Sequence, residues 1–345
     1  MEEVIFLTVT FIPLILTLWL ANLADREWEK PRPIFAILTY LLLGLFWGLL
    51  FSGGALSALA GTLFFLFPDL SAGAPPLGDV PASSFLLKIG LALWLPALAG
   101  LLLPTPPARR LLARVIPIDP GRMVHAVALS FSMLVAVNLW LTLAIGLDTL
   151  VEELAAGPEM TTATVMSVTW VQDVLMALMA LVGVGWLTRR GWRESLQRLG
   201  LAWPTWRQAL LAAGLGAALV GLLLGVEHLL NLVGISFDED VSELTEQLVG
   251  PLMTSVPGIL TLGLAAALGE EMIFRGALQP RFGVLLTAIL FALLHSNYGV
   301  TLSTAVVLVL GLVLGWLRLR SNTTIAMITH ATYNIILGAL AYYGL

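Results

Sequence analysis

The sequence contains no cysteine and few charged residues. The absence of cysteine excludes disulfide bonds, thiolate metal sites and a cysteine nucleophile. Asp, Glu, Lys and Arg together make up 11% of the 345 residues, whereas a soluble domain carries about 25%. Hydrophobic residues make up 59%, and the mean hydropathy is +0.95. A soluble fold could not bury this much apolar surface, so the composition predicts an integral membrane protein.

Several motifs are also missing. The chain has no His-Glu-x-x-His zinc motif and no glycine-rich phosphate loop. It has no nucleic-acid motif either, and we interpret its arginine clusters as orientation signals and contacts to anionic lipids. The opening Met-Glu-Glu-Val lacks a basic n-region, so we expect the first apolar run to be a retained helix.

Apolar runs long enough to cross a bilayer recur along the whole chain. Ten of them are expected to span the membrane: 4–22, 34–53, 85–104, 123–147, 165–187, 206–234, 251–275, 283–297, 301–317 and 324–344. The run 54–67 is short, and it is expected either to extend the second helix or to re-enter the membrane. The predicted fold class is therefore all-α, a polytopic membrane helical bundle of about ten transmembrane helices.

Basic residues favour one side of this arrangement. They lie in or beside the odd-numbered connections, at 26–32, 109–122, 189–207, 275–281 and 318–320, and only Lys88 lies toward the other side. The even-numbered connections at 148–159 and 238–246 are acidic. The positive-inside rule places the basic loops in the cytoplasm, in a prokaryotic plasma membrane, with both termini outside.

The chain divides into two predicted regions. Residues 1–160 carry four spans and few intramembrane ionisable groups, and their role is open. Residues 161–345 carry nearly all of the intramembrane polar groups, including Asp173. An acidic segment with Gly and Pro, 151–158, links the two.

Six polar residues lie inside the predicted spans: Glu270, Glu271, Arg275, His295, His330 and Asn334. A charged side chain at the bilayer centre costs roughly 2.5–3.5 kcal/mol on insertion scales. We therefore expect the six to face one another instead of lipid, as they would in a functional site.

The first motif is Glu270-Glu271-x-x-x-Arg275. Glu271 and Arg275 are four residues apart, so they can pair on one helix face, which leaves Glu270 to face another helix. A carboxylate in a poorly solvated pocket can serve as a general base near neutral pH. The alternative is an ordinary helix end at the cytoplasmic surface.

The other two motifs repeat the spacing of four. Phe291 and His295 share one face, as do His330 and Asn334. The second pair offers two hydrogen-bond donors toward one point, which suits a developing oxyanion. The alternative for each histidine is a structural hydrogen bond between helices.

Together these groups supply a base, its orienting partner and oxyanion donors, which are the parts needed to activate water against an amide carbonyl. Glutamate and histidine also ligate zinc in catalytic sites. A glutamate-activated water without a metal ranks first, and a divalent metal such as zinc stays open as a cofactor.

In this order, the three motifs resemble those of the CPBP or Abi family. That family comprises the CAAX prenyl proteases of type II and related bacterial bacteriocin-processing or immunity proteins, and the resemblance covers roughly residues 165–345. It implies an intramembrane endopeptidase that cuts a membrane-associated protein or peptide. By this resemblance Glu270 and His295 activate water, and His330 and Asn334 stabilise the oxyanion. Glu271, Arg275 and Phe291 would then support the site from its edge.

Two other functions remain open. One is a non-catalytic membrane scaffold or immunity protein, and the other is a proton-coupled transporter that uses Asp173 with the glutamates and histidines as a relay. The expected partners are the lipid bilayer and a membrane-associated substrate, with no nucleic acid. The site of the protease is expected on the cytoplasmic side. Neither the substrate nor the oligomeric state follows from the sequence.

Overall fold

The computed structural model describes residues 2–27, 32–71, 81–157 and 160–344. Lys30 and Glu159, which belong to the charged connections, lie outside the described residues. The N-terminal part contains α1 (Glu2–Ala24), α2 (Ile34–Leu66), α3 (Ala82–Leu102), α4 (Pro106–Leu112), α5 (Met123–Ile145) and α6 (Leu147–Ala156). The C-terminal part contains α7 (Thr162–Gly183), α8 (Trp192–Leu199), α9 (Trp206–Leu232), α10 (Glu239–Val249), α11 (Val256–Glu271), α12 (Gln279–Leu294), α13 (Leu302–Arg320) and α14 (Thr323–Tyr343).

Shorter helical segments complete the chain. They are the 3-10 turns η1 (Pro68–Ser71), η2 (Gly250–Thr254) and η4 (Ser296–Tyr298), and the π-helix η3 (Met272–Leu278). The described residues form no β-strand, only one isolated bridge between Trp186 and Arg190. The predicted all-α membrane bundle is confirmed.

Nine helical segments among the described residues are long and apolar enough to cross a membrane. The ten predicted spans differ in number from these nine segments because of one region, residues 251–297. The expected spans 251–275 and 283–297 belong to one continuous helical run, Val256–Leu294. The segments before and after this run, η2 and η4, both contact α10, so the run must double back. The reversal occurs at Gly283, whose φ of 77° is a left-handed conformation that favours glycine.

The run 54–67 extends the second helix. α2 continues without interruption to Leu66 and packs along α3 over most of its length. The first of the two predicted alternatives is therefore confirmed.

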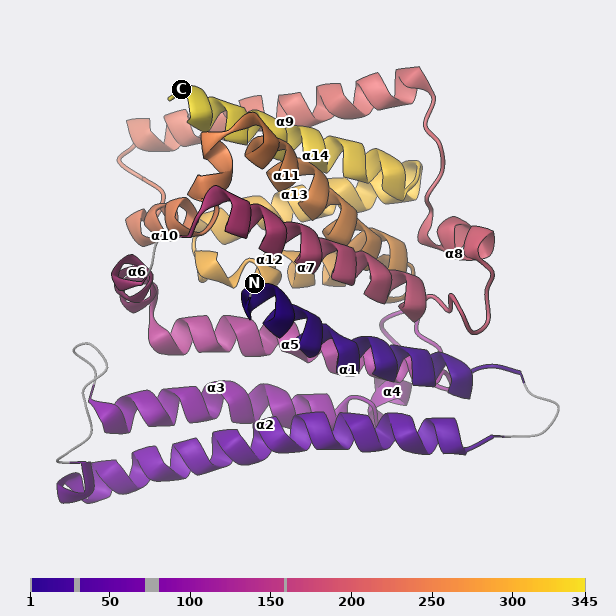
Figure 1. The fold of residues 1–345 in the computed structure, drawn as a ribbon, viewed down its shortest axis with the longest axis vertical. Coiled ribbons are helices and arrows are strands. Elements are labelled where there is room, and N and C mark those ends of the chain that lie inside the picture. Colours follow the sequence, from indigo (N-terminus) through magenta and orange to yellow (C-terminus); the bar gives the residue numbers. More distant parts are fainter. Residues whose placement is uncertain (1, 28–31, 72–80, 158–159, 345) are drawn as a thin grey trace.

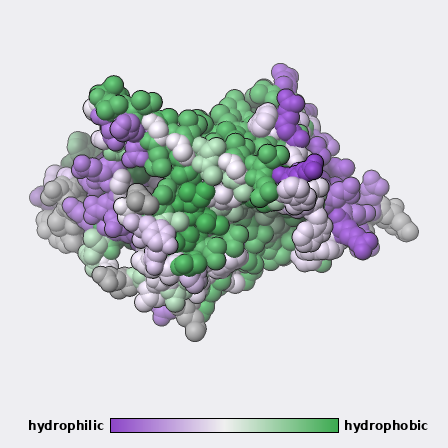
Figure 2. Space-filling model, turned by 90° about the horizontal axis from the view of Figure 1, so that it is seen from above, coloured by the Kyte–Doolittle hydropathy of each residue, from purple (hydrophilic) through white to green (hydrophobic). Residues whose placement is uncertain are grey.

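The long helices lie side by side, with α2 and α3 at one edge of the bundle and α9 and α14 at the other (Figure 1). Hydrophobic residues cover the middle of the surface, and hydrophilic residues gather at its two ends (Figure 2). This is the pattern of a multi-pass membrane protein. We call the end with α4 and α8 the arginine-rich end, and the end with α6 and α10 the acidic end (Figure 1).

The largest buried cluster joins both predicted regions. Ile118 and Leu129 from the N-terminal part pack with Phe274 and Phe291 from the C-terminal part. α1 and α5 contact α7 and α12, respectively. A division into domains near residue 160 stays a prediction, and the shared core means that α1 and α5 help to hold the C-terminal helices.

Candidate active site

The candidate site lies where α7, α11, η3 and α14 meet, with the end of α12 beside it. α11 begins at Ser255, whose hydroxyl accepts a hydrogen bond from the Gly258 amide at 3.2 Å. It continues to Glu271, where the α-helix gives way to η3. Short π-helical segments inside helices are frequent at functional sites, because the extra residue redirects the side chains that follow.

Glu271 and Arg275 form a buried ion pair at the start of η3. Arg275 Nε lies 3.2 Å from Glu271 Oε2, and the two side chains are 0% and 1% exposed, respectively. Arg275 also stacks over the ring of Phe291, with Cζ 4.2 Å from the ring centroid. The predicted pairing is present, and because both side chains are buried the pair is not an ordinary helix end at the surface.

His330 connects this pair to the third motif. Its Nδ1 lies 3.0 Å from Glu271 Oε1, and its Nε2 lies 3.3 Å from Asn334 Nδ2. A carboxylate only accepts, so Nδ1 carries a proton and donates to Glu271. Glu271 therefore fixes the orientation of the imidazole, as the acidic member of a catalytic triad does. His330 and Asn334 share one helix face, as predicted.

Glu270 points away from Glu271 and toward α14. Its Oε2 lies 4.0 Å from His330 Nε2, too far for a direct hydrogen bond. Among the described residues this oxygen is buried and has no hydrogen-bond partner. A gap of this size between a free carboxylate oxygen and an imidazole nitrogen is suited to a bridging water.

Asp173 on α7 adds a third carboxylate beside Glu270. Its side chain is buried and interacts electrostatically with Glu270 and His330, and its Oδ1 has no hydrogen-bond partner in the described part of the chain. It packs against Gly269, where an added Cβ would collide with the carboxylate. The sequence offered Asp173 only as a possible relay group, because nothing in the spacing places it next to Glu270.

His295 lies at the end of α12, outside this hydrogen-bonded network. Its Nδ1 lies 3.0 Å from the carbonyl oxygen of Phe291, so Nδ1 donates and the neutral ring keeps a lone pair on Nε2. The described residues show no hydrogen bond or ion pair from His295 to Glu270. Phe291 is the link, since its ring contacts those of His295 and His330 with centroids 5.1 and 5.9 Å apart.

Tyr298 is a site residue that the sequence did not reveal. Its ring stacks on His295 with centroids 5.7 Å apart, and its hydroxyl bonds the side chain of Thr245 on α10. Burial, and then the charge of Glu270, raise the pKa of Tyr298 above its ordinary value. A tyrosine in a short connection carries no signal in the sequence that marks it.

The contacts around Tyr298 also show which end of the bundle His295 faces. η4 touches α10 and α5, and Gly299 lies against Leu147 at the start of α6. His295 therefore faces the acidic end of the bundle. The reversal at Gly283 carries His295 away from the arginine-rich end, whereas η3, which follows Glu271, contacts α8 at that end. The expectation of a site on the cytoplasmic side stays a prediction.

No group of three or more His, Cys, Asp or Glu side chains is arranged to hold a metal ion within the described ranges. Glu271 and His330 are engaged with each other, and Glu271 also with Arg275.

Comparison with known proteins supports the resemblance seen in the sequence. Residues 251–336 match the family model described as Rce1-like, type II CAAX prenyl endopeptidase. The matched segment contains every residue of the three motifs. The uncharacterized protein YpbD of Bacillus subtilis (strain 168) is 36% identical over 81 residues, which are 22% of this chain and 41% of YpbD. No solved structure matches the chain. The resemblance to the CPBP family is confirmed for the matched segment.

Proposed function

We propose that this membrane protein is an intramembrane endopeptidase that hydrolyses a peptide bond of a membrane-associated protein or peptide. The similarity of residues 251–336 to type II CAAX prenyl endopeptidases supports a protease of the CAAX type. The observation that carries the proposal is Oε2 of Glu270, which has no hydrogen-bond partner among the described residues and lies beside the buried chain of contacts from Arg275 through Glu271 to His330.

In the proposed reaction, Glu270 takes a proton from a water molecule held between its carboxylate and His330. The resulting hydroxide adds to the carbonyl carbon of the scissile bond, and the carbonyl oxygen becomes an oxyanion. The C–N bond then breaks, and the leaving amine takes the proton from Glu270. A positioned general base typically contributes 10²–10⁴-fold to the rate.

The oxyanion donors are Nδ2 of Asn334 and Nε2 of His330 in its imidazolium form. Asn334 Nδ2 also lies 3.4 Å from the carbonyl oxygen of Leu262, which limits its rotation. Glu271 holds the other imidazole nitrogen, so the ring keeps its direction while charge develops. In this proposal His295 acts as a second acceptor for the water through the lone pair on its Nε2.

The test is cleavage by the purified full chain in liposomes. A farnesylated peptide with a C-terminal Cys-a-a-X sequence is the first substrate, and membrane proteins of a host cell are the second, followed by sequencing of new termini. Glu270→Gln should lower turnover at least 10²-fold. The matched control is Glu152→Gln, an exposed carboxylate of α6, which should leave turnover unchanged. Full turnover by folded Glu270→Gln would refute the assigned base.

A membrane scaffold is the competing outcome. It would be supported if no new termini depended on Glu270 while the biological effect of the protein survived Glu270→Gln. The motif residues would then serve only to hold the helices together.

We further propose that the membrane is a prokaryotic plasma membrane with the arginine-rich end in the cytoplasm. The site would then open toward the outer face, next to α10. The chain has no cysteine, so single cysteines report orientation without background. Ala156→Cys should react with an impermeant maleimide on intact cells, and Arg193→Cys only after lysis. The opposite pattern would reverse the orientation and return the site to the cytoplasm.

A further inference from the structure

A large cavity lies at the junction of the two predicted regions. It has a volume of about 500 Å³ and is lined by α1 and α5 on one side and by α7, η3 and α12 on the other. Its size is within the range of about 300–1,000 Å³ typical of small-molecule sites. It does not include Glu270, His330 or Asn334.

The cavity is long and mostly apolar. Along α5 its lining runs from Arg122 to Asn138, which is about 24 Å at 1.5 Å per residue. Its middle is lined by apolar side chains such as Phe131, Met176 and Leu290. A chain of methylene groups matches this shape and polarity better than a compact polar ligand does.

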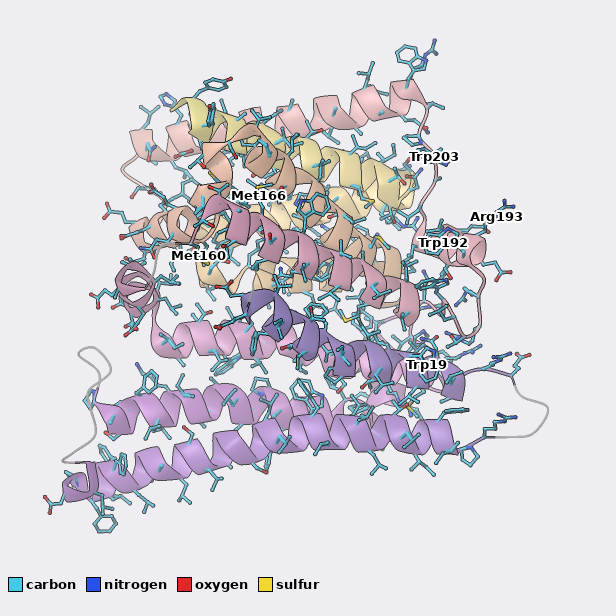
Figure 3. All side chains as sticks on the ribbon, viewed as in Figure 1. Trp19, Met160, Met166, Trp192, Arg193 and Trp203 are labelled. Carbon is cyan, nitrogen blue, oxygen red and sulfur yellow. The ribbon has the colours of Figure 1, made fainter. Side chains whose placement is uncertain are left out.

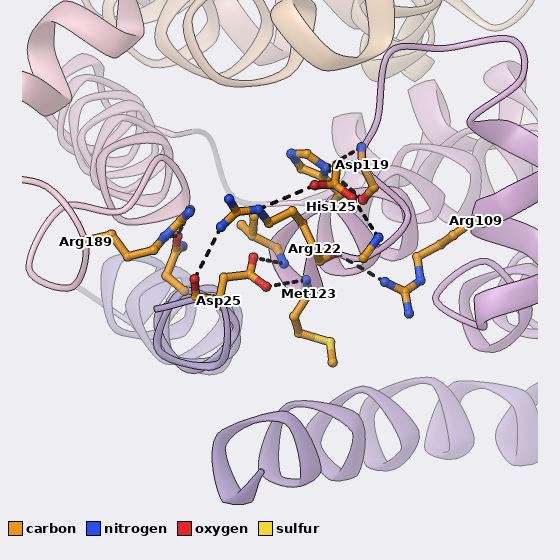
Figure 4. Close-up of polar contacts among 10 residues, drawn as sticks. Asp25, Arg109, Asp119, Arg122, Met123, His125 and Arg189 are labelled. Atoms are coloured by element: carbon orange, nitrogen blue, oxygen red, sulfur yellow. Dashed lines mark hydrogen bonds and ion pairs between the residues drawn. The ribbon is translucent and has the colours of Figure 1, made fainter. Parts of the chain in front are cut away.

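Five arginines line the arginine-rich end of the same cavity: Arg122, Arg189, Arg190, Arg198 and Arg281. Asp119 is the only carboxylate in this described lining, and it pairs with Arg122 at 3.6 Å. The nearby carboxylate of Asp25 accepts hydrogen bonds from two backbone amides at the start of α5 (Figure 4). The end of the cavity therefore carries a large excess of positive charge.

Neutral groups hold several of these arginines in place. Arg189 donates to the side-chain oxygen of Asn22 from Nε at 3.0 Å, Arg190 donates to the carbonyl oxygen of Val184, and Arg198 donates to that of Gly276 at 3.1 Å. These contacts order the guanidinium groups but leave their charge unbalanced. Burial, and then the neighbouring arginines, lower the pKa of Arg198 to about 10. An anion at this point would relieve the repulsion.

We propose that this cavity binds an anionic phospholipid, with its phosphate among the arginines and one acyl chain between α5 and α12. Guanidinium groups recognise phosphate through paired N–H donors. The lipid would bridge the N-terminal helices and the matched segment, which gives α1 and α5 a role in the stability of the site. The proposal does not depend on the peptidase reaction.

The test is native mass spectrometry of the delipidated full chain, titrated with phosphatidylglycerol or with phosphatidylcholine of the same acyl chains. Phosphatidylglycerol should bind at least tenfold more tightly. The double variant Arg190→Ala/Arg281→Ala should remove this preference. The matched control is Arg193→Ala/Arg207→Ala, because neither residue lines the cavity and Arg193 points away from the bundle (Figure 3).

Two further measurements separate a lipid from a free anion. Ala128→Trp, in the apolar lining, should weaken phosphatidylglycerol binding at least tenfold while the arginine-rich end stays intact. Inorganic phosphate alone should raise the thermal midpoint less than the lipid does. If the double variant fails to fold, Arg281→Ala serves instead, because that side chain is exposed. Equal binding of both lipids, or equal stabilisation by phosphate alone, would overturn the proposal.

Discussion

The α2–α3 pair and the α11–α14 region both hold membrane helices together, but through different kinds of contact. α2 and α3 are held by close backbone contact at small residues, and Ser57 of α2 donates a hydrogen bond to the carbonyl oxygen of Leu86 of α3 at 2.8 Å. An added Cβ at Gly61 would lie 2.6 Å from the amide nitrogen of Leu87. α11 and α14 instead enclose Glu271, Arg275 and His330.

Close packing of small residues explains how α2 and α3 are joined, but it does not explain the buried charges between α11 and α14. Without a hydrophobic driving force in lipid, small residues that let backbones approach are an ordinary way to join helices. A buried ion pair is not needed for that purpose, because desolvation of its charges offsets much of its Coulomb attraction. The charged network of the C-terminal region is therefore better explained by chemistry than by stability.

The largest stability effect is expected at the Glu271–Arg275 pair. Either Glu271→Gln or Arg275→Gln leaves one buried charge without its partner, which should cost about 3–5 kcal/mol of unfolding free energy. The double variant Glu271→Gln/Arg275→Gln should lose less than the sum of the two single losses, but it should remain inactive. Chemical unfolding in mixed micelles measures the unfolding free energy of the single variants and of the double variant. Additive losses would mean that the two groups do not interact.

A smaller effect is expected in the α2–α3 pair. Gly61→Val would force the two backbones apart and should cost about 1–3 kcal/mol, with turnover per folded molecule unchanged. Gly53→Val is the matched control in the same helix, because nothing lies within 4 Å of an added Cβ there. Thermal midpoints and turnover per folded molecule distinguish Gly61→Val from Gly53→Val. A loss of turnover in Gly61→Val would show that the N-terminal pair acts on the site.

A still smaller effect on stability is expected at Tyr298. Tyr298→Phe removes the hydrogen bond to Thr245, which should cost about 0.5–1.5 kcal/mol at pH 8. Because the folded-state pKa is raised, the stability that the neutral hydroxyl provides is present below about pH 10 and is lost at higher pH. The gap between wild type and Tyr298→Phe should therefore shrink from pH 8 to pH 11 in thermal denaturation. A constant gap would contradict the raised pKa.

The smallest effect is expected from metal removal. If Glu270 activates water without a metal, dialysis against EDTA should leave turnover within about twofold of the untreated enzyme, a change in the barrier of well under 1 kcal/mol. Readdition of zinc to the treated protein is the control. Loss of turnover with EDTA and its return with zinc would place a divalent ion in the mechanism.

Much of the fold followed from the sequence because lipid imposes a strong constraint. Every span must satisfy its backbone hydrogen bonds internally, so long apolar runs could only become helices. The spacing of four predicted the pairing of Glu271 with Arg275 and the shared helix face of His330 and Asn334. The predicted roles of Glu270, His295, His330 and Asn334 remain proposals.

Other features depended on contacts between distant segments. No local pattern places Asp173 against Gly269, Tyr298 on His295, or five arginines around one cavity. The reversal at Gly283 decided which end of the bundle His295 faces, and no local pattern in the sequence shows that. The membrane side on which the site lies stays a prediction.

The sequence by itself determined that this protein lies in a lipid bilayer, that its fold is all-α and which helix faces carry its polar groups. Hydrophobicity and the helical repeat are local properties of the chain, so they can be recognised without the tertiary structure. Only the tertiary structure decided that Glu271 orients His330, that Glu270 Oε2 lies near His330 without a direct hydrogen bond and that α5 and α12 line one cavity. Those relations depend on how helices far apart in the chain pack together, and packing is a property of the whole bundle.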